Sequence, residues 1–447
     1  MEIERGACLR ADRVLAMKPI TSVVYSIVLL AAVLCHPLAT RGQENASTQT
    51  ESDEYTSYEL LAPESASFAI RYEVTATTPG ATVYFNPIRK GSVASDESVR
   101  DVMSGESLKF EIVSGTDAVK DPLLKGEDAD VGYIKVHLAR PVPPQGQARL
   151  LILKTYKDAK SYYREGNTVV FNRRLSIPRN KVILPGGYEV VACNVPSQVL
   201  TEPDGRISVS FMNGSGTEAP LIVKARRGAQ IGAPPKSADR THWNGSPPEA
   251  WPETWQLAER AHSDQESVLL LRQPETHSYQ QTFDYTTTPE TTLAYGFNGK
   301  TGVTGVSAYV LDTGEELKAK VLTRTEVEKT TSEPRVLARY THFVVISPPA
   351  SESRQSLRIR VVETVTEPTV LRVMDQELVF ERALKYARNA VVLPSGWYVT
   401  ATSLPATVNQ LQDGRIRLDF WNGGPAPVEA LVKARRRVAA VGDAESH

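Results

Sequence analysis

The sequence has few cysteines and no closely spaced histidines. Its three cysteines are Cys8, Cys35 and Cys193. Only Cys193 would remain if the N-terminal segment were removed, which excludes an internal disulfide in an exported chain. Core burial must then hold the domains together, and Cys193 is expected to be a small buried apolar residue. No two of the seven histidines are three to five residues apart. This excludes the paired histidine ligands of common zinc motifs, and we expect no metal and no cofactor.

The chain also lacks a surplus of either charge. It has 51 Lys and Arg against 52 Asp and Glu, a formal net charge of -1. A nucleic-acid-binding protein usually carries a basic surface, so we expect no nucleic-acid partner. The 29 prolines and 28 glycines disfavour an all-helical protein. A length of 447 residues is typical of two or three domains.

No apolar run is long enough for an ordinary membrane span. The apolar stretch at residues 20–35 carries no charge, follows several basic residues and is shorter than the roughly 20 residues that a spanning helix needs. This pattern predicts a signal peptide over residues 1–43 and a secreted, periplasmic or cell-envelope protein. A retained anchor, which would bring membrane contact, and a lipoprotein modified at Cys35 are the alternatives. The polar segments 44–57 and 438–447 are expected to be disordered.

An internal repeat organises the rest of the chain. Residues 171–227 align without gaps on residues 380–436, and 25 of the 57 positions are identical. The shift is 209 here and drifts to 211 upstream, where Pro63-Glu64 meets Pro274-Glu275. We therefore expect copy 1 of a domain at residues 58–228 and copy 2 at residues 269–437, joined by a linker at 229–268.

Each copy has the pattern of short β-strands. Asp204-Gly205 and its repeat lie between alternating runs, which is a hairpin signal, and Leu-Pro-x-Gly recurs as a turn. The predicted fold class is all-β, with two tandem homologous antiparallel β-sandwich-like domains and a short helix-containing linker. Further short helices are predicted at residues 97–102 and around residues 157–163.

Two sets of residues are candidates for a role. The first set recurs in both copies next to turns, which fits a structural polar network better than a site used twice; it comprises Arg179, Asn180, Asp204, Arg206, Arg388, Asn389, Asp413 and Arg415. The second set is the linker trio Trp243, Trp251 and Trp255. Exposed tryptophans bind sugar rings and protein partners, although these three could equally seal the seam between the domains.

Short motifs carry a family resemblance. The run from Ala139 to Gly146, followed by Leu150-Leu151-Ile152-Leu153 and Thr155-Tyr156, is similar to extracellular β-domains that precede zinc aminopeptidase modules, and to lumenal β-domains of ribophorin-like proteins. The peptidase metal motif is absent, so the resemblance implies no catalytic residue. The repeated Leu-Pro-x-Gly-aromatic and Asp-Gly-Arg-Ile units look like those of uncharacterised bacterial exported proteins.

The leading hypothesis is a non-enzymatic exported binding protein whose partner is a protein or glycan of the cell envelope. Two copies on one chain would raise avidity. The alternative is a hydrolase of envelope polymer or peptide, with carboxylates such as Asp204 and Glu189 brought together by the fold. A third possibility is a structural spacer without a sizeable pocket.

Overall fold

The structure of the chain is a computed structural model. It describes residues 48–214, 217–228, 258–288, 293–297, 302–329, 340–347, 355–424 and 426–437. The predicted signal peptide at residues 1–43, the predicted tail at residues 438–447 and the trio Trp243, Trp251 and Trp255 lie outside these ranges. Most of the predicted linker also lies outside them, at residues 229–257. Within the described ranges, no helix has the length and apolar character needed to cross a membrane.

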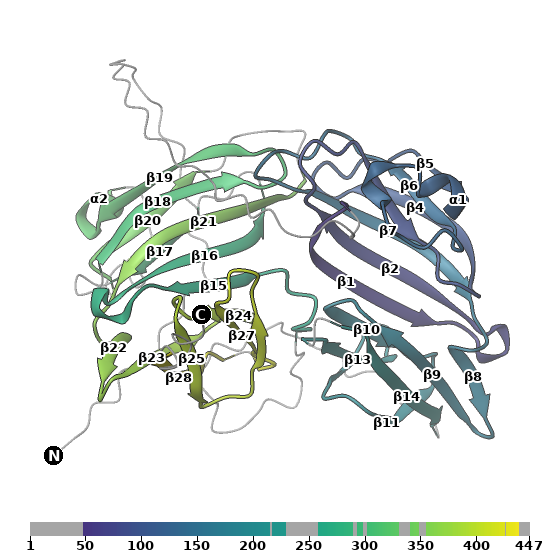
Figure 1. Cartoon of the computed structure of the whole chain (residues 1–447). Helices are drawn as coiled ribbons and strands as arrows, with labels where there is room; N and C mark the ends of the chain where they lie inside the picture. The colour runs from purple at the N-terminus through teal and green to yellow at the C-terminus, as the bar shows by residue number, and fades with distance from the viewer. Residues whose placement is uncertain are drawn as a thin grey trace, which may run out of the picture.

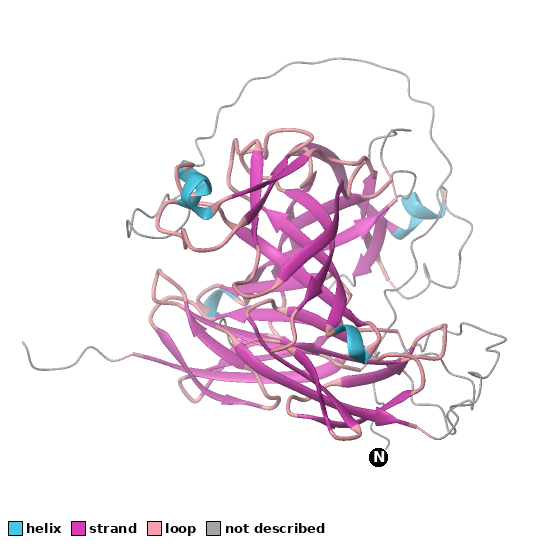
Figure 2. Ribbon diagram, turned by 90° about the vertical axis from the view of Figure 1, so that its right-hand side faces the viewer, coloured by secondary structure: helices cyan, strands magenta, loops and turns pink. Residues whose placement is uncertain are grey.

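The protein is all-β, as the sequence predicted, and its strands form several stacked sheets (Figures 1 and 2). The first half has a seven-stranded sheet in the order β12 (Gln198–Thr201), β13 (Ile207–Met212), β10 (Arg179–Ile183), β1 (Glu51–Leu60), β2 (Ser67–Ala76), β7 (Ala148–Lys157) and β4 (Val93–Asp101). A four-stranded sheet follows the order β11 (Tyr188–Cys193), β14 (Ala219–Arg227), β9 (Thr168–Leu175) and β8 (Tyr162–Glu165). A three-stranded sheet has β3 (Val83–Pro87), β6 (Tyr133–His137) and β5 (Phe110–Val113).

The second half repeats this strand order. A ten-stranded sheet runs β17 (Leu293–Phe297), β20 (His342–Ser347), β19 (Glu315–Thr323), β18 (Gly302–Val310), β21 (Leu357–Thr366), β16 (Ser278–Thr287), β15 (Glu266–Leu271), β24 (Arg388–Val392), β27 (Ile416–Trp421) and β26 (Thr407–Gln410). The smaller sheet has β22 (Leu371–Met374), β23 (Glu377–Leu384), β28 (Val428–Arg436) and β25 (Trp397–Thr402). Strand βn of the first half thus corresponds to strand βn+14 of the second, which agrees with the sequence repeat.

Helices are short and peripheral (Figure 2). The described α-helices are α1 (Gly115–Ala118) and α2 (Arg324–Glu328), and the 3₁₀ turns are η1 (Pro63–Ser65), η2 (Pro122–Leu124) and η3 (Pro274–Thr276). The helix predicted at residues 97–102 is not formed, because residues 97–101 belong to β4, which pairs with β7. The helix predicted around residues 157–163 is not formed either, because this segment comprises the end of β7, a turn and the start of β8. Tertiary pairing overrides the local propensity here.

Two further expectations need correction. The segment 44–57 was expected to be disordered, but β1 begins at Glu51 and pairs with β2 and β10. Likewise β15 begins at Glu266, within the segment assigned to the linker. Strand pairing is also not wholly antiparallel, because β1 pairs with β10, and β15 with β24, in parallel. A long connection permits parallel pairing, which a tight hairpin does not.

The core of each copy lies between its sheets. In copy 1, Phe68, Phe171 and Tyr156 are fully buried, and the Phe68 ring meets the other two rings edge-on. In copy 2, Tyr279 and Phe380 pack in the same edge-on manner. The turn predictions also hold: Gly187 and Gly396 in Leu-Pro-x-Gly adopt positive φ, as do the Asp-Gly glycines.

Candidate functional site

The recurring arginines of β10 and β24 converge on one carboxylate. Arg179 binds Asp53 through Nε and Nη2, at 3.0 and 2.9 Å. Arg388, its counterpart in copy 2, binds the same carboxylate through Nη1 and Nη2, both at 3.0 Å. Burial alone would raise the pKa of Asp53, but Arg388, Arg179 and Arg358 outweigh it and hold that pKa well below its ordinary value. We name Asp53, Arg179, Arg358 and Arg388 the arginine clamp.

The arginine clamp joins the two copies. Asp264, the counterpart of Asp53, binds Arg358 Nη1 at 2.7 Å, and its backbone carbonyl accepts from Arg388 at 2.8 Å. A second buried pair crosses the same boundary, where Arg149 binds Asp312 at 2.7 and 2.8 Å. Buried, bidentate pairs impose strict geometry. These contacts therefore set the position of one copy against the other, as a structural network would.

The remaining recurring polar residues stabilise turns. Asn180 and Asn389 each donate from Nδ2 to a backbone carbonyl three residues earlier, at 2.6 and 2.7 Å. Asp204 and Asp413 each accept from the backbone and side chain of the arginine two residues later; the pairs are Asp204–Arg206 and Asp413–Arg415. Each contact is local and occurs in both copies.

An open hollow of about 400 Å³ lies at one end of copy 1, and we name it the arginine hollow. Three recurring motifs meet there: Leu-Pro-x-Gly, Asp-Gly-Arg and the basic end of β14. Its polar lining consists of Arg164, Arg206, Arg227, Glu59 and Glu64, and its other walls include Leu60, Pro63, Pro185 and Tyr188. Sequence reasoning identified each motif but could not place the three together.

The guanidinium groups of the arginine hollow are unequally engaged. Arg164 binds Glu64 at 2.5 Å, and Arg206 binds Glu59 at 2.6 Å. Arg227 is exposed and forms no ion pair with any described residue. In copy 2 its counterpart Arg436 binds Glu275, the counterpart of Glu64. In copy 1, Arg164 takes Glu64 as its partner. The counterpart of Arg164 on β22 is the apolar Val373, so Glu275 is left to pair with Arg436.

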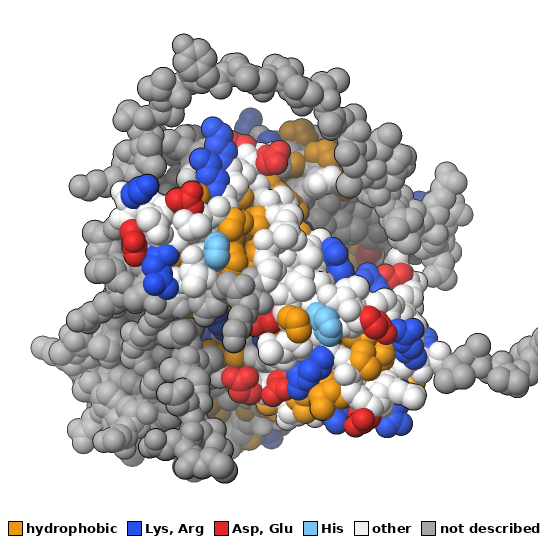
Figure 3. Space-filling model, turned by 90° about the vertical axis from the view of Figure 1, so that its left-hand side faces the viewer, with side chains coloured by type: hydrophobic (Ala, Val, Ile, Leu, Met, Phe, Trp, Pro, Cys, Tyr) orange, Lys and Arg blue, Asp and Glu red, His pale blue; other side chains and the backbone are white. Residues whose placement is uncertain are grey.

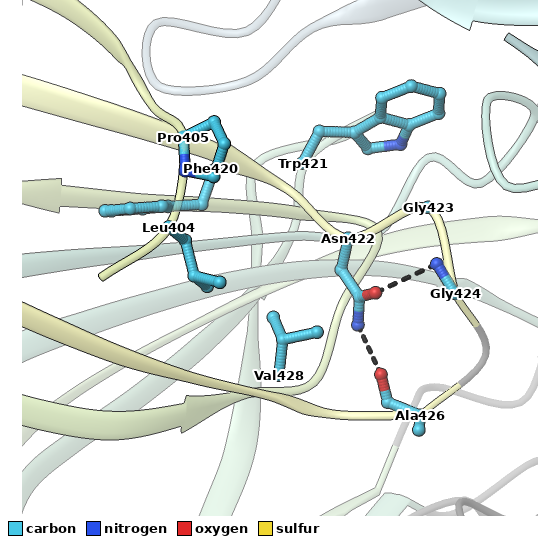
Figure 4. Close-up of a pocket in the computed structure, with 9 residues that line it drawn as sticks. All are labelled: Leu404, Pro405, Phe420, Trp421, Asn422, Gly423, Gly424, Ala426 and Val428. Atoms are coloured by element: carbon cyan, nitrogen blue, oxygen red, sulfur yellow. Dashed lines mark hydrogen bonds between the residues drawn. The ribbon is translucent and has the colours of Figure 1, made fainter. Parts of the chain in front are cut away.

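A second hollow, of about 390 Å³, lies at the end of β27 in copy 2 and is largely apolar (Figure 4). Leu404, Pro405 and Phe420 lie together on one side, whereas the Trp421 ring points away from them. Asn422 closes the turn, donating to the Ala426 carbonyl at 2.6 Å and accepting from the Gly424 amide at 3.0 Å. The asparagine amide is thus used internally, which leaves apolar surface rather than a reacting group.

The carboxylates suggested for a hydrolase do not act as a pair. Asp204 is bound by Arg206, and Glu189 is bound by Arg226 at 2.6 Å. The backbone amide and side chain of Arg206 lower the pKa of Asp204, opposite to what a general acid needs.

A carboxyl group with a raised pKa lies elsewhere, at Glu54 on β1. Burial and a hydrogen bond to Glu51 raise the pKa of Glu54 to about 9. Neither residue lines the two hollows described above. Both residues lie in the acidic segment 44–57, whose composition predicts disorder and not a buried pair. Across the described ranges, no group of three His, Cys, Asp or Glu side chains could hold a metal ion.

Comparison with known proteins adds little. No family model matches the chain, and no curated protein matches it. Solved structures with partial similarity include a variant of a two-domain M1 zinc metallopeptidase bound to L-tryptophan, with 13% identity over 41% of this chain and a TM-score of 0.28. The M1 zinc metallopeptidase from Deinococcus radiodurans has the same values, 13% identity, 41% coverage and TM-score 0.28. This chain spans 43% of either structure's length. Similarity at this level supports no conclusion about activity.

Proposed function

We propose that the protein is an exported, non-enzymatic binding protein of the cell envelope or the secreted fraction, and that it binds an acidic group of a protein or glycan partner. The observation that carries this proposal is Arg227, an exposed guanidinium at the rim of an open hollow that forms no ion pair with a carboxylate of the described residues. Arginine forms bidentate hydrogen bonds with carboxylates, and its planar head is well suited to such recognition.

The surroundings of Arg227 support a binding role. Glu64 and Glu59 form ion pairs with Arg164 and Arg206 and fix their positions. The hollow is therefore pre-organised while the guanidinium of Arg227 stays exposed for a ligand. The apolar walls at Leu60 and Pro63 offer contact to the aliphatic part of a ligand. Copy 2 lacks this arrangement, because Arg436 forms an ion pair with Glu275. The two copies are therefore not equivalent sites, and simple avidity from duplication is not expected.

The experiment compares Arg227→Ala with the matched variant Arg436→Ala in copy 2. The chain from residue 43 onward is titrated, at low and physiological salt, with hexaglutamate, hexaglutamine and an oligogalacturonate. We expect one acidic ligand to bind, with at least tenfold weaker affinity in Arg227→Ala and little change in Arg436→Ala. The acidic ligand that binds distinguishes a protein partner from a glycan. Equal effects of the two variants, or binding of hexaglutamine as tight as that of the acidic ligands, would refute the proposal.

The apolar surface of copy 2 does not indicate a large docking patch. The described exposed apolar side chains there include Val321 on β19 and Val373 and Met374 on β22. On the face shown in Figure 3, apolar groups are interspersed with basic and acidic ones. Scattered exposed apolar residues are ordinary for soluble proteins, so the arginine hollow is the better candidate.

A further inference from the structure

The backbone beside the arginine hollow is built alike in both copies. Each copy has a 3₁₀ turn at this place, η1 in copy 1 and η3 in copy 2. The residue before each turn is Ala62 in one copy and Gln273 in the other. Their φ and ψ angles are -51° and 129° for Ala62, and -53° and 129° for Gln273. The two copies therefore differ here in their side chains and not in the course of the backbone.

In copy 2 the chain supplies an amide and a carboxylate of its own. Gln273 Oε1 accepts from Trp397 Nε1 at 3.0 Å, and Gln273 Nε2 donates to the Ser395 carbonyl at 3.4 Å. Glu275, two residues later, forms the ion pair with Arg436. The guanidinium of Arg436 also lies 5.1 Å from the centre of the Trp397 ring. Copy 2 thus satisfies its arginine and its turn with one carboxylate and one amide group.

In copy 1 the residues that form the amide bridge are replaced by smaller ones. Ala62 stands where copy 2 has Gln273, and Gly186 stands where copy 2 has Ser395. Both are exposed and line the arginine hollow. A Cβ added at Gly186 would meet no atom within 4 Å. Copy 1 therefore keeps the backbone of this place but has open space where copy 2 has its amide.

The carboxylate of copy 1 is bound elsewhere. Glu64, the counterpart of Glu275, forms its ion pair with Arg164 and not with Arg227. A hydrogen bond from its own backbone and the charges of Arg164 and Arg227 lower the pKa of Glu64, so it is anionic at neutral pH. Among the described residues, Arg227 thus lacks the paired carboxylate that its copy 2 counterpart has.

We infer that the arginine hollow binds the C-terminus of a peptide. The terminal carboxylate pairs with Arg227, and the last peptide amide takes the place of the Gln273 amide and donates to the Gly186 carbonyl. The walls at Leu60 and Pro63 contact the last side chain. This inference rests on the proposed function, because it requires that Arg227 binds an acidic group. A uronate unit supplies the carboxylate without an adjacent amide, so a peptide matches the two positions better.

The first test compares two forms of one ligand. The full chain is titrated with acetyl-Ala-Ala-Ala that has a free C-terminal carboxylate, and with the same peptide amidated at its C-terminus. We expect the free acid to bind at least tenfold more tightly than the amidated peptide. Equal affinity for the two forms, or no binding of the free acid, would overturn the inference.

The second test installs copy 2 residues in copy 1. Ala62→Gln places the copy 2 amide in the hollow, and Arg164→Val copies Val373 and releases Glu64 to pair with Arg227. Ala62 is exposed and the Arg164 side chain is 44% exposed, so neither change disturbs the core. Each variant is expected to bind the free-acid peptide at least tenfold more weakly, whereas the matched change Gln273→Ala should leave the affinity unchanged. Unchanged affinity in both copy 1 variants would contradict the inference.

A third comparison separates this inference from the proposed function. Hexaglutamate is titrated with a free and with an amidated C-terminus into wild type and Arg227→Ala. Equal binding of the two forms that depends on Arg227 would mean that side-chain carboxylates bind, which refutes the inference and leaves the proposed function standing. Arg227-dependent binding of oligogalacturonate alone would have the same meaning. Failure of every acidic ligand to bind through Arg227 would overturn both.

Discussion

Replacing Lys154 by methionine tests the energetic description of the copy 1 core. Methionine matches the unbranched shape of lysine but removes the charge and the bond to Asn86. Lys154 is only 6% exposed, and burial together with Arg173 lowers its pKa from 10.5 to about 7. The gap between these pKa values corresponds to roughly 4–5 kcal/mol against the charged form in the folded state.

The sign of the pH dependence follows from proton binding. Above pH 10.5 the amine is neutral in both states and carries no charge penalty. As the pH falls from 10.5 to about 7, the unfolded chain takes up the proton first, so the free energy of unfolding decreases. Below pH 7 both states are protonated, and the penalty stays constant. The methionine variant lacks this dependence.

The assay is urea unfolding of wild type and Lys154→Met from pH 6.5 to 10.5. Leaving Asn86 without its partner costs about 1–2 kcal/mol, so the variant is expected to be more stable by roughly 2–4 kcal/mol at pH 7. That advantage should shrink as the pH rises and reverse near pH 10.5, where only the cost of about 1–2 kcal/mol at Asn86 remains. Other titrating groups are common to both proteins and cancel in the difference. A difference that stays constant over this range, or that grows with pH, would refute the reasoning, and Lys90→Met, which removes an exposed lysine, should show no such trend.

Three other predictions have defined outcomes. Asp53→Asn leaves the clamp arginines without their shared carboxylate and should lower the free energy of unfolding by about 3–5 kcal/mol. The matched surface change Asp204→Asn should cost less than about 1 kcal/mol by the same denaturation assay. Glu54 has its pKa raised to about 9, so the folded state keeps a proton that the unfolded chain releases, and stability declines as pH rises from 4.5 to 9. Glu54→Gln should remove this decline, and its advantage over wild type should grow by about 2–4 kcal/mol across that range. Asn422→Ala removes both hydrogen bonds that close its turn and should cost about 1–2 kcal/mol, and a cost near zero would show that the turn does not need them.

Local patterns predicted the fold class well and the domain edges less well. Alternation and Asp-Gly turns predicted strands and hairpins, because these depend on residues close in sequence. The strand at Glu51 was missed, because its acidic residues are stabilised by partners far along the chain. Arg388, for example, lies 335 residues from the carboxylate it binds.

The sequence showed the separate motifs of the candidate site but not that they lie together. The sequence showed that Arg206 and its repeat lie beside turns, and the structure places Arg206 in the arginine hollow. It also showed basic ends on both copies, but not that Arg436 forms an ion pair with Glu275 while Arg227 forms none within the described part of the chain. That difference depends on Arg164, which is distant in sequence from both Glu64 and Arg227.

The sequence by itself determined the repeat, the β-strand character and the turns, since each depends on composition or on spacing along a few residues. Only the tertiary structure decided how charges are shared. It brings Arg179 and Arg388 to one aspartate, and it buries Lys154 where copy 2 has Glu363. A charged side chain finds its partner on a strand from a distant part of the chain. The spacing of residues along the sequence does not say how far apart two such side chains lie in the folded protein.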